Sequence, residues 1–131
     1  MNNKLTPEES FSKLANNEFI NEVKNWLKID ICFCEEDTIG SIQYKDNSDE
    51  IELRIDNSLN NDVLLNKAIL LLIIIFFYCV RNGEIEIGQS DKGVCFDGGI
   101  IEQLENNDIS EYYTYINYFL DCILNDEQEE K

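Results

Sequence analysis

Residues 68–80 read AILLLIIIFFYCV, a run without a single charged side chain. Crossing a bilayer takes about 20 apolar residues, whereas a run of about 10 to 14 is typical of a helix buried inside a domain. Lys67 precedes the run, and Arg81, Asn82 and Gly83 follow it as a helix stop. We therefore expect a helix over residues 61–81 that is apolar all round and covered by other elements. Its β-branched residues leave a buried strand as the alternative, which its length disfavours.

The start of the chain carries a second helix signal. Thr6, Pro7 and Glu9 supply an N-cap hydroxyl, a proline at the first helical position and the glutamate of a capping box. Apolar residues then recur every three or four positions and predict one buried face on a helix over residues 7–28. They are Phe11, Leu14, Ala15, Phe19, Ile20, Val23, Trp26 and Leu27. We expect Trp26, the single tryptophan, in the core.

Short segments with alternating apolar and polar residues follow on both sides of the central helix. Before it they are residues 29–34, 41–45 and 50–55, separated by stretches rich in Asp, Asn and Glu. After it they are residues 84–87 and 94–96, with a turn at residues 90–93. A period of two predicts strands with one buried face, and the intervening polar stretches predict turns.

The end of the chain predicts helix again. Residues 100–105 indicate a short helical turn, residues 108–111 cap a last helix, and residues 125–131 form a charged tail. The buried stripe of the last helix comprises Tyr112, Ile116, Phe119, Leu120, Ile123 and Leu124. The order is α-β-β-β-α-β-β-α. We expect one α+β domain, residues 1–131, with a mainly antiparallel sheet of about five strands and the hydrophobic helix at its centre.

The chain is strongly acidic, with 27 Asp plus Glu against 10 Lys plus Arg, no His and a formal net charge of −17 among 131 residues. Without an imidazole, Ser-His-Asp and Cys-His catalysis and His-based zinc sites are excluded. The acid excess also argues against direct contact with nucleic acid or an anionic membrane, whose phosphates require Lys and Arg. The excess lies in residues 28–60, with charge −6, and residues 84–131, with charge −11.

The five cysteines show no metal-type spacing. Cys32 and Cys34 form a CxC pair in a predicted strand, and Cys79 and Cys122 lie in apolar helical stretches, where a free thiol behaves as a small hydrophobe. An odd count of this kind fits a reducing compartment. No signal peptide opens the chain, so we expect a cytoplasmic protein, in the host cytoplasm if a phage encodes it.

Carboxylates are the abundant candidate groups. Glu50 and Glu52, and likewise Glu84 and Glu86, flank an isoleucine and should face outward from a strand. They fit a solvated face, a partner-binding face or, less well, a metal-dependent active site. Residues 46–50 lack the glycine and the final glutamate of an EF-hand loop, and the glycines at 98 and 99 lack a phosphate-loop pattern. We therefore expect no metal and no cofactor.

Tyrosines crowd the last helix among acids. If the stripe defines its buried face, Tyr115 and Tyr118 stand partly outside it, close to Glu111 and Asp121. Aromatic anchors with a carboxylate rim are typical of a protein-binding patch. The alternative is that these tyrosines only edge the core with their hydroxyls in water.

Three functions remain open. In size and charge the chain resembles small phage anti-CRISPR and other anti-defence proteins and immunity proteins against nuclease toxins, although no motif ties it to one family. This resemblance implies a non-enzymatic inhibitor that blocks the basic nucleic-acid-binding surface of a nuclease or CRISPR effector. The alternatives are a small-molecule-binding or regulatory domain, and a metal-dependent carboxylate enzyme.

Overall fold

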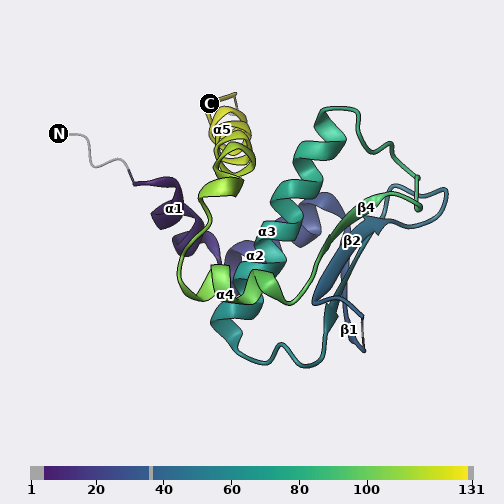
Figure 1. Cartoon of the computed structure of the whole chain (residues 1–131). Helices are drawn as coiled ribbons and strands as arrows, with labels where there is room; N and C mark the ends of the chain where they lie inside the picture. Colours follow the sequence, from purple (N-terminus) through teal and green to yellow (C-terminus); the bar gives the residue numbers. More distant parts are fainter. Residues whose placement is uncertain (1–4, 36, 130–131) are drawn as a thin grey trace.

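The computed structural model describes residues 5–35 and 37–129, and it places every helix on one side of a sheet (Figure 1). The N-terminal helices are α1 (Pro7–Leu14) and α2 (Asn17–Leu27). The strands are β1 (Ile29–Cys34), β2 (Gly40–Tyr44), β3 (Ile51–Asp56) and β4 (Gly93–Phe96). The remaining helices are α3 (Asp62–Arg81), α4 (Gly99–Glu105), the 3-10 turn η1 (Ser110–Tyr112) and α5 (Tyr113–Glu129). The expected α+β class is confirmed.

Helix α3 forms the centre of the fold, as the uncharged run predicts. The Asn61 side chain caps it by accepting hydrogen bonds from the N–H groups of Val63 and Leu64. Its residues 68–77 are all buried between the sheet and the other helices. By length and composition alone this helix could also cross a membrane, but the sheet and α5 cover its middle. Figure 1 shows α3 lying between α5 and the sheet.

The sheet differs from expectation in strand count and direction. Its order is β1-β3-β2-β4, with β1 and β3 parallel and the other two pairs antiparallel. The prediction of a strand at residues 84–87 is wrong. The chain folds back at the end of α3, and these residues do not pair with any described strand. The apparent alternation there reflects one buried side chain, Ile85, since Ile87 is 68% exposed. A four-stranded mixed sheet results.

The two faces of the sheet have different chemistry. The strand register puts Ile31, Leu53 and Ile42 in one row facing α3, and Phe96 of β4 lies on the same face. The opposite face carries polar and ionisable side chains, since successive residues of a strand alternate sides. This outer face holds Asp30, Cys32, Ser41, Gln43, Glu52, Arg54 and Cys95.

The predicted N-terminal helix is two helices. The Asn16 side chain accepts from the N–H of Phe19 at 2.8 Å and donates to the carbonyl of Lys13 at the same distance, so it caps α2 and ends α1. Asparagine is a preferred N-cap because its short side chain reaches these backbone groups. The apolar spacing runs through this break, which is why it predicts a single helix. Helix α5 packs Phe119 edge-on against Phe77, with centroids 5.3 Å apart, and continues to Glu129, past the predicted start of a tail.

Candidate functional site

The turn between β2 and β3 and the loop after α3 meet at one end of the sheet (Figure 1). The N–H of Asn47 donates to the carbonyl of Gly88 at 3.1 Å, and the Ser90 hydroxyl donates to the Asp46 carboxylate at 3.4 Å. Two acidic segments that are far apart in sequence therefore share one surface, which we call the acidic corner. We define it by the acidic residues of the two joined segments, which are Asp46, Asp49 and Glu50 in the turn and Glu84, Glu86 and Asp91 in the loop.

The loop reaches the turn because the end of α3 folds back. Gly83 adopts φ +76, and the N–H groups of Glu84 and Ile85 both donate to the Cys79 carbonyl, at 2.8 and 3.3 Å. Ile85 is buried, whereas Glu84 and Glu86 on either side of it are exposed. One apolar anchor thus holds two carboxylates at the surface. Burial, and after it the Glu84 carboxylate, raises the pKa of the Cys79 thiol.

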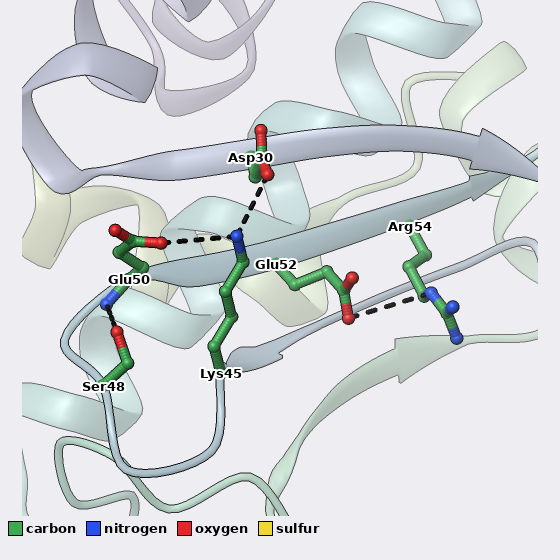
Figure 2. Close-up of polar contacts among 6 residues, drawn as sticks. All are labelled: Asp30, Lys45, Ser48, Glu50, Glu52 and Arg54. Carbon is green, nitrogen blue, oxygen red and sulfur yellow. Dashed lines mark hydrogen bonds and ion pairs between the residues drawn. The ribbon is translucent and has the colours of Figure 1, made fainter.

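Part of the acidic corner is neutralised by lysines. Lys28 Nζ lies 2.8 Å from Asp49 Oδ2, and this partner lowers the pKa of Asp49. Lys45 Nζ lies 3.0 Å from Asp30 Oδ2 and 3.3 Å from Glu50 Oε1, and both carboxylates raise the pKa of Lys45 (Figure 2). The lysine bridges β1 and the β2–β3 turn. These pairs are solvent-exposed, so each contributes little to stability.

The remaining carboxylates of the corner are not paired with lysines. Within residues 5–35 and 37–129, no ion pair is made by Asp46, Glu84, Glu86 or Asp91. Carboxylates without a cationic partner attract a basic surface. This gathering of uncompensated charge is what the fold adds to the bulk acidity of the sequence.

Glu52 lies apart from the corner, on the outer face of the sheet. Its Oε1 is 3.8 Å from Arg54 Nε on the same strand (Figure 2). Glu50 and Glu52 were expected to act as one outward pair. Each instead has its own cation nearby, so the two present less net charge than Glu84 and Glu86.

The candidate residues of the last helix lie on another part of the molecule. Tyr115 and Tyr118 pack their rings edge-on against Tyr78 of α3, with centroid distances of 4.8 and 5.3 Å, and both are half-buried. Glu111 accepts a 2.6 Å hydrogen bond from the Gln103 side chain of α4. Asp121 is exposed. Helix α3 separates α5 from the sheet, so these residues lie away from the β2–β3 turn.

Trp26 was expected in the core, but it is 48% exposed at the rim of a groove. The groove has a volume of 230 Å³ and runs between α2, the sheet and the end of α3. Phe77 forms its floor, 6.1 Å from the Trp26 ring, and the Arg81 guanidinium lies 4.8 Å above Phe77. The helical spacing of Trp26 indicates a core position, and nothing local in the sequence reveals that this end of α2 is open.

A second hollow, of 540 Å³, lies where the parallel strands β1 and β3 end. It is lined by Glu35, Asp37, Asp56, Asn57 and Ser58. The Ser58 hydroxyl donates to the Asp56 carboxylate. Over the part of the chain that the structure describes, no three Asp, Glu or Cys side chains converge closely enough to hold a metal ion.

Comparison of the chain with protein-family models, with curated proteins and with solved structures finds no significant match in any of the three.

Proposed function

We propose that the protein is a non-enzymatic acidic inhibitor that covers the basic nucleic-acid-binding surface of another protein, such as a nuclease or a CRISPR effector. The observation that carries the proposal is the acidic corner, where the Asn47–Gly88 contact joins two acidic segments. Carboxylates there compete with phosphates for the same Lys and Arg side chains, which bind either anion through charge-assisted hydrogen bonds.

The charge of the whole chain supports this mode of action. A formal charge of −17 gives long-range attraction to a basic partner, and such steering accelerates association at low salt. The inhibitor would therefore bind quickly, and its affinity would fall as salt screens the charges.

The test captures basic nucleases and CRISPR effectors on the immobilised full chain, then measures association rates over a salt series with and without nucleic acid. The double variant Glu84→Lys/Glu86→Lys should slow association on the order of tenfold. Its matched control is Glu102→Lys/Glu105→Lys, which makes the same change in net charge on exposed residues of α4, beyond the other end of β4. Equal slowing by both variants, or affinity independent of salt and of nucleic acid, would contradict the proposal.

The groove beside Trp26 favours a second candidate, a small-molecule-binding domain. Its aromatic floor and the single cation Arg81 suit a small flat anion, although its 230 Å³ is below the roughly 300 Å³ at which typical ligand pockets start. Trp26 is the only tryptophan, so its fluorescence reports on the groove directly. Saturable quenching by an aromatic carboxylate that is lost in Arg81→Gln would support this candidate.

A further inference from the structure

Strand β1 has one open edge. The carbonyl of Lys28 accepts from Ile51 N–H, and the carbonyl of Cys34 accepts from Asn57 N–H, each at 2.9 Å. Backbone groups of a parallel strand point alternately toward and away from its neighbour. Since these even-numbered positions face β3, the N–H and C=O groups of Ile31 and Phe33 point away from the sheet. Among the described residues, no strand pairs with this edge.

The features that usually protect an edge are weak here. Natural sheets protect their edges with short strands, prolines, bulges or charges. The opposite edge strand, β4, has only 4 residues, whereas β1 has 6 and reads IDICFC, with no proline and one charge. Phe33, on the face toward the helices, is 54% exposed. The edge therefore offers both unpaired backbone groups and an uncovered aromatic side chain.

The surroundings of this edge select a cationic occupant. The acidic hollow lies at the end of β1, and its Glu35 and Asp37 are exposed, with no ion pair within the described residues. A second copy of the chain would bring another −17 to the same place, which charge repulsion opposes. A basic segment would instead gain the attraction of these carboxylates.

We propose that β1 accepts an extended segment of the partner protein as a fifth strand, in which apolar and basic residues alternate. Its backbone pairs with Ile31 and Phe33, its apolar side chains cover Phe33, and its basic side chains lie on the outer face and at the hollow. The inference rests on the proposed function, because it takes the partner to be basic, and it names the element through which that partner is held.

Two variants separate the contribution of the Phe33 backbone N–H to binding from that of the Phe33 side chain. Phe33→Pro removes an N–H that points outward, so the β1–β3 hydrogen bonds remain, and the lost side chain is exposed. Phe33→Ala loses the same side chain and keeps the N–H. Stronger loss of binding in Phe33→Pro than in Phe33→Ala is expected of strand addition.

The experiment uses the full chain and a synthetic peptide of alternating lysine and valine, about six residues long to match β1. Amide hydrogen exchange at Ile31 and Phe33 should slow by at least about tenfold with this peptide. The same peptide N-methylated at every amide has no N–H to donate to the ladder and should give no protection. A peptide of alternating glutamate and valine should give no protection, because its negative charge is repelled by the acidic surroundings of β1.

Equal protection by the methylated peptide, or no protection at millimolar concentrations of the unmethylated peptide, would overturn the inference. Both exchange measurements use the native chain, so they remain decisive even if Phe33→Pro does not fold. Protection that appears without peptide and grows with protein concentration would assign the edge to a second copy. If a folded Phe33→Pro variant inhibits a basic partner as well as the native chain does, strand addition at β1 is overturned and the inhibitor function is not. If the peptide protects the β1 amides but the chain does not compete with nucleic acid for any basic partner, the inhibitor function is overturned and strand addition is not.

Discussion

The backbone nitrogen of Asn47 and the carbonyl oxygen of Gly88 lie 3.1 Å apart and join two segments that are separated in sequence by all of β3 and all of α3. Asn47 itself has φ +55 and Gly88 has φ +83, so both sides of the contact use left-handed backbone. Asparagine tolerates this region and glycine occupies it freely. The acidic corner depends on this pairing of two special backbone conformations.

Gly88→Ala should loosen the corner. A Cβ at this position would lie 3.4 Å from the Asn47 Cα, and the positive φ costs an alanine about 1–2 kcal/mol. We expect the free energy of unfolding in urea to fall by about that amount. Gly98→Ala is the control, because a Cβ there meets nothing within 4 Å and its φ is −61. A loss as large in Gly98→Ala would show that φ at Gly88 is not the cause.

Lys28→Gln should change how stability depends on pH. Lys28 lowers the pKa of Asp49, so the pair stabilises the fold above the ordinary pKa of an aspartate, about 3.9, and this contribution is lost as the pH falls through the lowered value. The variant should therefore be less stable than the native chain at pH 7, with a difference in the free energy of unfolding that narrows as the pH falls through the lowered pKa of Asp49. Urea unfolding at a series of pH values measures this.

A carboxyl NMR titration of Asp49 checks the cause, because its pKa should rise when Lys28 is replaced. Lys24→Gln removes a positive charge from the same helix without an ion pair among the described residues, and it should leave that titration in place. An unmoved Asp49 in Lys28→Gln would refute the assignment.

The fold was predictable where a local signal had one physical meaning. The uncharged run before Arg81 and the cap at Asn61 specify α3 by themselves. Residues 84–87 mislead because a turn held by one buried side chain, Ile85, produces the same alternation as a strand. The break at Asn16 is signalled only by its capping preference, which the apolar spacing on both sides outweighs.

The candidate site was predictable in composition but not in arrangement. The exposure of Glu84 and Glu86 follows from their neighbours in sequence. The pairing of Glu50 with Lys45 does not follow from the local sequence. Lys45 also pairs with Asp30 of β1, and the β1–β3 register decides how close β1 lies to the β2–β3 turn. Parallel pairing between β1 and β3 also creates the free edge, and no local pattern encodes it.

The cysteines should differ in reactivity. Cys95 is exposed on the outer face of the sheet, whereas burial and Glu84 raise the pKa of Cys79 and keep it as the unreactive thiol. With a disulfide reagent at pH 8, Cys95 should react roughly tenfold or more faster than Cys79, as resolved by peptide mass spectrometry. Glu84→Gln should raise the rate at which the reagent modifies Cys79 and leave the rate at Cys95 unchanged. Faster modification of Cys79 in the native chain would contradict its placement.

Gly40 and Leu72 should be energetically coupled. A Cβ on Gly40 would lie 3.0 Å from Leu72 Cδ1 and 2.9 Å from Ile55 Cδ1, so Gly40→Ala overpacks the contact between β2 and α3 and should cost about 1–3 kcal/mol. Leu72→Ala leaves a cavity in the fully buried core and should cost about 2–5 kcal/mol. Because the second change makes room for the first, the double variant should be more stable than the sum of the two predicts. Additive losses in urea unfolding would mean that the contacts left unchanged, Ile55 Cδ1 and the Arg54 carbonyl 3.1 Å from the same Cβ, limit the approach instead.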